Sequence, residues 1–522
     1  MASETKAERV ERIKVEKDGF DVLDDIIRYA QTGEEIHPED LDRFKWYGLY
    51  TQNKNLQGDD EKTYFMLRIK VEQGYLSSEQ LLEVAKISKE FARDTADLTT
   101  RQDVQFHWIE IENLPEIFQR LERVGLSVTG ASGDCPRNIV SCPVNGIDKE
   151  QIDDVRDLVD ALNDLYRANR EFSNLPRKFK VGVSGCNKHC ISHEVQDLTF
   201  TAVKRAKNEL VFSVSVGGGQ ASNRRIASHI GFIQRKDVVE VSKAVAILYR
   251  DNGRRDNRSK ARLGHLVEAW GEEKFLAELE KLSGVKFEAF DGMKFTPYPR
   301  RSHFGIIESS KQGYNAIGYA IPAGRIGNKI FKLAQELKDY NAEGITLTTT
   351  QNIVVQGVAQ ELTQSFAKKI QDSIDLSVEP SVFEARTLAC TGLNFCKFAI
   401  SETKNFSIEV VDYLKKRFPD FSEPVSISIN GCPNSCAHPH IVDLGFIGAM
   451  VKSGEERVNG FHLVVGGNLE GEESRFSIKT DVKVTSSEVP LLIESLIEEY
   501  EQSLNSNFGN FILEKYSNEP AF

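Results

Sequence analysis

The stretch at residues 98–104 (LTTRQDV) decides the architecture of this chain, because it returns as LTTTQNI at residues 347–353, an offset of 249. Two further matches follow in the same order and at nearly the same offset: SGCNKHC (184–190) with NGCPNSC (430–436), and VGG (216–218) with VGG (465–467). Self-similarity at one fixed offset is typical of an internal duplication. The sequence therefore predicts two homologous halves.

Each half begins with alternating strand and helix patterns. Residues 64–71 (YFMLRIKV) alternate with the period of two expected of a strand, and apolar residues in 77–91 recur at helical spacing. The remaining predicted elements are a strand at 104–111 and a helix at 114–124, then in the second half a strand at 316–321, a helix at 328–338 and a strand at 353–358. Such units predict an α+β fold. In each half a later strand, at 179–183 and at 425–429, leads into a cysteine-bearing loop.

Length and composition describe an ordinary globular protein. The 522 residues suggest about three domains, and 40% hydrophobic with 28% charged residues is a normal composition. The net charge of −12 argues against a nucleic-acid partner. We find neither an uncharged apolar run of about 18 residues nor an apolar signal segment in the charged N-terminus. We therefore expect a cytoplasmic protein with no membrane partner.

Eight cysteines form two groups, one in each half: Cys135, Cys142, Cys186 and Cys190, and Cys390, Cys396, Cys432 and Cys436. Disulfide-dense chains are usually small and secreted, so the clustering favours thiolate metal ligands. The C-x5-C and C-x3-C spacings of the second group could hold zinc or an iron–sulfur cluster, and pairs wider than zinc knuckles favour the cluster. For the first group, unrelated buried thiols remain an equally good interpretation.

The second group also carries a family resemblance. CTGLNFC at 390–396, followed by NGCPNSC at 430–436, resembles the siroheme and iron–sulfur motif of the assimilatory sulfite and nitrite reductases, the ferredoxin-type sulfite reductases most of all. Further matching motifs extend the resemblance from about residue 40 to 505: WYGLY (46–50), TTRQ (99–102), RN (137–138), PRKFK (176–180) and PAGRI (322–326). An internal duplication is the architecture of that family.

The resemblance implies a three-domain siroheme reductase fold with an internal pseudo-twofold repeat. Its parts would be an N-terminal arm at 1–57 anchored by Trp46, Tyr47 and Tyr50, a ferredoxin-like half-domain at 58–127 that pairs with a second one at 313–380, a siroheme- and substrate-binding lobe at 128–312, and a [4Fe–4S]/siroheme lobe with the C-terminal tail at 381–522.

The resemblance also implies cofactors and a reaction. Cys390, Cys396 and Cys432 would ligate a [4Fe–4S] cluster, and Cys436 would ligate it too and bridge it to the siroheme iron. The reaction would be the six-electron reduction of sulfite to sulfide, or of nitrite to ammonia. No G-x-G-x-x-G motif for a flavin or nicotinamide follows a predicted strand, so we expect an external donor, and ferredoxin is the family's usual one. A non-catalytic redox or zinc-stabilised protein on the same scaffold is a further alternative.

A small oxyanion substrate calls for fixed cations. The resemblance places four of them on the substrate face: Arg101, Arg137, Lys178 and Lys180. Arginine suits multidentate contact with oxygens, and lysine can also supply protons. The period of a strand puts Lys178 and Lys180 on one face, with Phe179 on the other. Nitrite reductases of the family usually have asparagine in place of Lys180, which favours sulfite and leaves nitrite as the alternative.

Siroheme carries eight carboxylates and needs basic partners. The resemblance places them near the stretch 250–262 (RDNGRRDNRSKAR), in which Arg258, Lys260 and Arg262 are the candidates. The glycine run that includes Gly217 and Gly218 is expected to approach the macrocycle closely, although such a run is also typical of a tight turn.

Most relatives have lost the cluster ligands of the first half, whereas this chain keeps four cysteines: Cys135, Cys142, Cys186 and Cys190. One hypothesis is a second [4Fe–4S] cluster. Against it, Arg137 and Asn138 lie between the first two cysteines and are needed at the substrate face, and Cys142 is common in relatives without a second cluster. A second hypothesis is a perturbed, modified thiol at Cys135, with Tyr64 as a conceivable neighbour.

Overall fold

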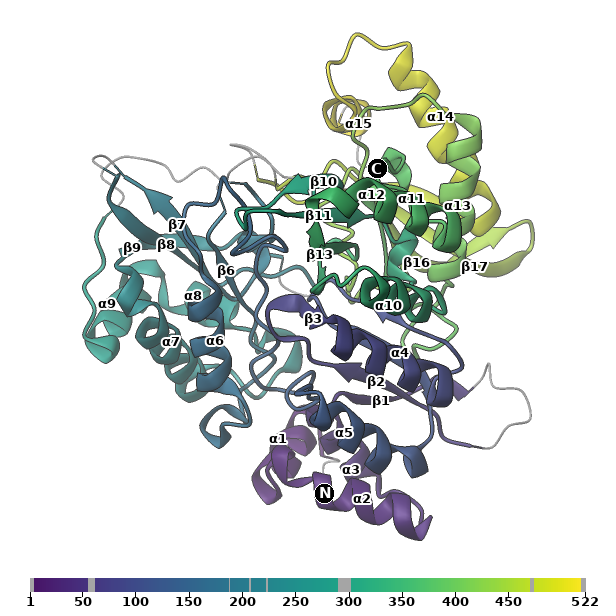
Figure 1. Cartoon of the computed structure of the whole chain (residues 1–522). Coiled ribbons are helices and arrows are strands. Elements are labelled where there is room, and N and C mark those ends of the chain that lie inside the picture. The colour runs from purple at the N-terminus through teal and green to yellow at the C-terminus, as the bar shows by residue number, and fades with distance from the viewer. Residues whose placement is uncertain are drawn as a thin grey trace.

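The structure is a computed structural model that describes residues 4–54, 62–186, 188–205, 208–221, 224–289, 302–469 and 474–517. In these residues, four sheets and their helices form a central body with a lobe on either side (Figure 1). Within the same ranges, no helix is both long and apolar enough to cross a membrane.

The central body is built by the N-terminal parts of both halves. Its first sheet has the order β1–β2–β5–β4, with bounds Leu49–Thr51, Phe65–Ile69, Val104–Ile109 and Asp97–Leu98. Its second sheet has the order β10–β11–β13–β12–β3, with bounds Gly305–Glu308, Tyr314–Tyr319, Ile353–Ala359, Gly344–Leu347 and Tyr75–Ser77. Because β3 belongs to the first half, it ties the two sheets together. One hydrophobic core, from Phe20 to Leu376, continues through both halves.

The predicted elements of this body are present, with small shifts in their bounds. Helix α4 (Ser78–Phe91) begins after Ser77 because the Ser77 hydroxyl and the Gln80 side chain cap each other's backbone N–H groups. It packs against its counterpart α10 (Lys329–Asp339), and α5 (Leu114–Arg123) follows β5 as predicted. The α+β prediction and the internal repeat are therefore confirmed.

Two lobes flank the central body and share one sheet plan. In the first, β6–β7 are parallel and β7–β8–β9 antiparallel; in the second, β14–β15–β16 are parallel and β16–β17–β18 antiparallel. The strands of the first lobe are Val181–Ser184, Leu198–Lys204, Leu210–Val216 and Ser228–Ile233, and its helices α6 to α9 are Arg156–Tyr166, Val238–Asn252, Leu263–Trp270 and Glu272–Ser283. The strands of the second are Thr387–Ala389, Ile427–Asn430, Leu444–Ser453, Glu456–Val465 and Ile478–Thr485, and α12 to α15 are Val382–Arg386, Lys404–Arg417, Val489–Glu501 and Phe508–Ser517. Helix α11 (Thr363–Ile374) closes the central body.

The two lobes are tied to the central body by equivalent hydrogen bonds. The Thr100 hydroxyl donates to the Cys436 carbonyl at 3.3 Å, and the Thr349 hydroxyl donates to the Cys190 carbonyl at 3.0 Å. Thr100 and Thr349 are equivalent in the repeat, as are Cys436 and Cys190. Each half therefore contacts the cysteine loop of the other, which is the behaviour of a pseudo-twofold.

The N-terminal segment forms part of the first central sheet and also contacts the first lobe. It forms α1 (Lys6–Glu16), α2 (Leu23–Thr32) and α3 (Pro38–Arg43), and then contributes β1 to the first central sheet. Trp46, 3% exposed, donates its indole N–H to the Ser173 carbonyl at 2.8 Å and so reaches the first lobe. Trp46 thus links the N-terminal segment to the first lobe.

Candidate functional site

Parallel strands bring the second-half cysteines together. Cys390 follows β14, and Cys432 and Cys436 follow β15. These two strands are parallel neighbours, so their carboxyl ends lie at the same edge of the sheet, the usual place for a site in such sheets. Four thiols from two separate stretches of the chain are thus brought to one edge of the sheet. Cys396 lies in the same loop as Cys390.

This edge opens into a cavity of about 320 Å³ between the central body and the two lobes. All four predicted cluster cysteines line it: Cys390, Cys396, Cys432 and Cys436. Cys432 is buried and Cys436 is exposed. In the part of the chain that the structure describes, no three of these sulfurs lie within 4.8 Å of one another. That open arrangement leaves room for a polynuclear cluster.

The four predicted substrate cations line the same cavity: Arg101, Arg137, Lys178 and Lys180. The Arg101 guanidinium is held by the Asn138 carbonyl at 3.1 Å and by the Gln196 side-chain oxygen at 2.8 Å. Arg137 donates to the Gly133 carbonyl at 2.8 Å. Neutral carbonyl and amide partners fix both groups without cancelling their charge. The cations therefore remain available to an anion.

Lys178 and Lys180 lie in the extended segment before β6, and Phe179 between them is fully buried on the other side. Among the described residues, neither ammonium group has a hydrogen bond or an ion pair. Burial, together with the charges of Arg262 and Arg137, lowers the pKa of Lys178 to about 7. Burial and the charge of Lys178 likewise hold the pKa of Lys180 well below its ordinary value. Both lysines are placed to gain an anionic partner.

The cavity as a whole is strongly cationic. The lining residues include eight lysines and arginines but only two carboxylates, Asp97 and Asp103, in the described part of a chain whose net charge is −12. Two polar atoms in the lining, Arg68 Nε and Gln220 Oε1, are buried without a hydrogen-bond partner in the same residues. Buried polar groups are normally satisfied, so the lining is built to receive a polar, anionic group.

Sequence reasoning missed several lining residues. Arg68 alternates with buried neighbours on β2, and that pattern alone could have placed it on the opposite face of the strand. Tyr50 also lines the cavity, and despite burial the charges of Arg137 and Arg68 lower the pKa of its hydroxyl. Burial raises the pKa of Asp103 to about 6. Asp103 therefore adds a group that can exchange a proton near neutral pH.

The predicted siroheme-carboxylate contacts are only partly brought to the cavity. Arg262 lines it and is ion-paired with the fully buried Asp197 at 2.7 Å. Arg258 instead pairs with Asp134 at 2.5 Å, and Lys260 is exposed. The sequence could not show this, because Asp134 lies 124 residues away from its partner.

The glycine run is explained by close packing of the protein on itself. A Cβ at Gly218 would lie 2.4 Å from the Gln196 carbonyl oxygen, and Gly217 has φ of +80° with Arg225 beside it. The following residues of the loop, Gln220 and Ala221, line the cavity instead. Close packing within the protein therefore accounts for glycine at both positions, and the approach of Gly217 and Gly218 to the macrocycle stays a prediction.

The first-half cysteines divide into three and one. The sulfurs of Cys142, Cys186 and Cys190 lie within 4.8 Å of one another. Cys135 lies apart in the central core, and its thiol is 3.1 Å from the Ser132 carbonyl. Burial raises the pKa of the Cys135 thiol to about 12, which is the opposite of a reactive thiolate. Tyr64, its expected neighbour, accepts a hydrogen bond from Arg93 and packs edge-on against Trp108.

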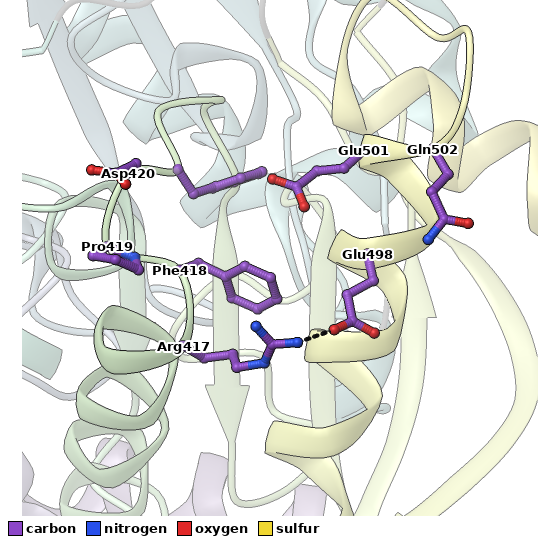
Figure 2. Close-up of a pocket in the computed structure, with 8 residues that line it drawn as sticks. Arg417, Phe418, Pro419, Asp420, Glu498, Glu501 and Gln502 are labelled. Carbon is purple, nitrogen blue, oxygen red and sulfur yellow. Dashed lines mark hydrogen bonds and ion pairs between the residues drawn. The ribbon is translucent and has the colours of Figure 1, made fainter.

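A second hollow lies on the second lobe, between the end of α13 and α14 (Figure 2). An Arg417–Glu498 ion pair crosses it, and Phe418 forms part of its wall. None of the predicted site residues is among the described residues that line it. We therefore assign the chemistry to the cavity between the lobes.

Comparison with known families agrees with this geometry. The family model described as the nitrite and sulphite reductase 4Fe–4S domain matches residues 132–287 and 385–510, once in each lobe. The nitrite/sulfite reductase ferredoxin-like half domain matches residues 57–124. The chain belongs to the nitrite and sulfite reductase family. Because one family model matches both lobes, this comparison agrees with the internal duplication found in the sequence.

Several relatives in this family are similar over nearly their whole length. The chain is 36% identical to a protein named sulfite reductase [ferredoxin] 1 from Mycolicibacterium paratuberculosis, covering 95% of this chain and 92% of the relative. It is 32% identical to a ferredoxin–nitrite reductase from Leptolyngbya laminosa, covering 96% and 98%. The solved structure of the Mycobacterium tuberculosis NirA protein superposes with a TM-score of 0.90 at 34% identity, covering 98% of this chain and 97% of that one. The predicted fold is thereby confirmed.

Membership of the family implies siroheme and a [4Fe–4S] cluster, and the cavity fits both groups. Four thiols stand at one edge in an arrangement wider than a single ion needs. The unpartnered Arg68 and Gln220 atoms and the surplus of cations suit the many carboxylates of a siroheme. The residues that would hold the two groups therefore face a common space.

Proposed function

We propose that this chain reduces sulfite to sulfide by six electrons at a siroheme coupled to a [4Fe–4S] cluster, with electrons from an external ferredoxin. The observation that carries the proposal is the single cavity that contains four cysteine thiols and the cations Arg101, Arg137, Lys178 and Lys180. The names of the sulfite reductase [ferredoxin] relatives support the substrate and the donor.

In this proposal Cys390, Cys396, Cys432 and Cys436 would hold the cluster, and Cys436, an exposed residue that lines the cavity, would also hold the siroheme. When bound, the two groups would supply a redox-active iron for the substrate and one-electron transfer to it. If Cys436 held both groups, a fixed position of its loop would help to keep them together. The hydrogen bond from Thr100 to the Cys436 carbonyl contributes to that rigidity.

The cationic side chains bind and orient the oxyanion. Arg101 and Arg137, fixed by carbonyl partners, present N–H donors that need not reorganise when negative charge arrives. Lys178, with a pKa of about 7, can both hold the anion when protonated and give up its proton at neutral pH. Each oxygen of the substrate leaves as water, so proton supply at this position is part of the reaction.

Nitrite reduction to ammonia is the second candidate, favoured by the 32% identity to a ferredoxin–nitrite reductase. Lys180 argues for sulfite, because sulfite carries more negative charge than nitrite and an additional cation on the lining stabilises it more. We also propose the domain division predicted from the sequence and a cytoplasmic location, since cysteine-ligated clusters need a reducing compartment.

The visible spectrum and turnover of the purified protein test this function. We expect a Soret band with a long-wavelength siroheme band, an iron content of about five per chain, and formation of sulfide from sulfite with a reduced viologen donor. A colourless protein, or a coloured one that reduces neither anion, would support the non-catalytic alternative and overturn the proposal.

A further inference from the structure

Three buried cysteines and one buried histidine converge at the junction between the first lobe and the second central sheet. His303 Nε2 lies 3.7 Å from Cys142 Sγ and 3.5 Å from Cys190 Sγ. The Cys186 sulfur completes a group of three within 4.8 Å of one another. All four side chains are at most 9% exposed. This group is separate from the cavity that contains the other cysteines.

The spacing of these four atoms fits one metal ion. In a tetrahedron with metal–sulfur bonds of about 2.3 Å and metal–nitrogen bonds of about 2.0 Å, the edges between ligand atoms are roughly 3.5–3.8 Å. The two distances to His303 Nε2 lie in that range. A cubane holds its thiolates farther apart, because its irons and sulfides stand between them. In the described residues the second-half cysteines have that wider spacing, and the first-half cysteines do not.

The backbone holds the four ligands in place from distant parts of the chain. Val140 and Gly182 form a parallel bridge, so the chain after each of them, which carries Cys142 and Cys186, runs side by side. His303 enters from the segment before β10, and a Cβ at Gly318 of β11 would lie only 1.5 Å from its carbonyl oxygen. Only glycine there lets the His303 backbone approach so closely.

The surroundings suit a closed structural site. The three cysteines pack with Ile307 and Val354 of the second central sheet in one small apolar cluster. The ligands span 161 residues between Cys142 and His303. An ion at this point would tie the first lobe to the central body.

We propose that Cys142, Cys186, Cys190 and His303 bind a structural zinc ion. The three thiols would bind as thiolates, losing their protons to solvent, and Nε2 of a neutral imidazole would supply the fourth ligand. Three sulfurs and one nitrogen are a common structural zinc set, and soft thiolates select zinc over magnesium or calcium. This site replaces the second [4Fe–4S] cluster considered from the sequence, with His303 in place of Cys135.

Metal analysis of the untagged holoenzyme tests the proposal without any substitution. We expect about one zinc per chain beside about five irons, and a zinc X-ray absorption spectrum with three sulfurs at about 2.3 Å and one nitrogen at about 2.0 Å. Less than about 0.2 zinc per chain, about nine irons, a disulfide among Cys142, Cys186 and Cys190, or four sulfur ligands around zinc would each overturn it.

Matched variants locate the ion. His303→Ala and Cys142→Ser should lower zinc to below about 0.2 per chain and lower the melting temperature by about 5 °C or more. Cys135→Ser removes an equally buried cysteine outside the group and should keep zinc, whereas Cys390→Ser should lose iron and keep zinc. Full zinc in both His303→Ala and Cys142→Ser would overturn the assignment. If either fails to fold, the absorption spectrum of the unsubstituted protein decides.

Discussion

Gln102 and Gln351 occupy equivalent positions in the two halves and make the same hydrogen bonds in opposite directions. Gln102 Nε2 donates to the Leu347 carbonyl at 2.7 Å, and Gln351 Nε2 donates to the Leu98 carbonyl at 2.8 Å. Each side-chain oxygen also accepts a backbone N–H from one lobe. Both residues have positive φ, 58° and 63°, at the tip of the repeated turn. The pseudo-twofold is thus fixed by a reciprocal pair of buried amides.

Replacing either glutamine should destabilise the fold. Gln102→Leu or Gln351→Leu leaves buried backbone groups without partners, at a cost of about 1–3 kcal/mol for each such group. We expect melting temperatures at least about 4 °C lower in calorimetry, and no comparable change in Gln119→Leu, whose side chain is exposed. Unchanged melting of both buried variants would contradict the role assigned to the pair.

The pH profile should depend on Lys178. Burial and neighbouring cations lower the pKa of Lys178 to about 7, and the carboxylates of a bound siroheme would raise it again. We therefore expect kcat/KM for sulfite to fall as the pH rises through a value at or above about 7. Arginine stays protonated over this range, so Lys178→Arg should lose that limb of the profile. Lys178→Met should lower kcat/KM about 100-fold. If the limb persists in Lys178→Arg, another group titrates there.

Lys180 should set the preference between the two anions. Lys180→Asn removes a charge that helps the more negative anion, so the ratio of kcat/KM for sulfite over nitrite should fall about tenfold, or about 1.4 kcal/mol. The exposed Lys204 provides a control, because Lys204→Asn should leave the ratio unchanged. An unaltered ratio in Lys180→Asn would show that Lys180 does not discriminate between substrates.

The Arg262–Asp197 pair should be essential to the cavity wall. Asp197 is fully buried, accepts the Lys180 backbone N–H at 2.8 Å and pairs with Arg262. Asp197→Asn leaves a buried arginine without its counter-charge, and breaking such a pair costs about 3–5 kcal/mol. We expect a large fall in melting temperature and weaker retention of siroheme. Asp154→Asn breaks an exposed pair with Arg156 and should have little effect.

Patterns between residues close together in the sequence predicted the local features of the site. Strand periodicity placed Lys178 and Lys180 on one face of the chain, and the repeat placed the cysteine loops after equivalent strands. Contacts between distant segments could not be predicted in this way. Arg258 pairs with Asp134, and His303 reaches Cys190 from 113 residues away with no spacing motif to reveal it.

The division of the eight cysteines also needed the structure. Spacing alone made Cys135 an equal of Cys142, yet Cys135 points into the central core while Cys142 lies in the small cluster at the lobe junction. Two residues seven positions apart in a loop can face different cores. Cys135, which the sequence suggested as a ligand of a second cluster, is therefore a buried thiol apart from the other three cysteines of the first half.

The most direct test of the central claim is the stoichiometry of steady-state reduction by the holoenzyme with reduced ferredoxin. We expect one sulfide to form for every six electrons consumed, with kcat/KM for sulfite above that for nitrite. Ammonia formation from nitrite at a kcat/KM more than about tenfold above that for sulfite, or electron consumption without sulfide, would contradict it.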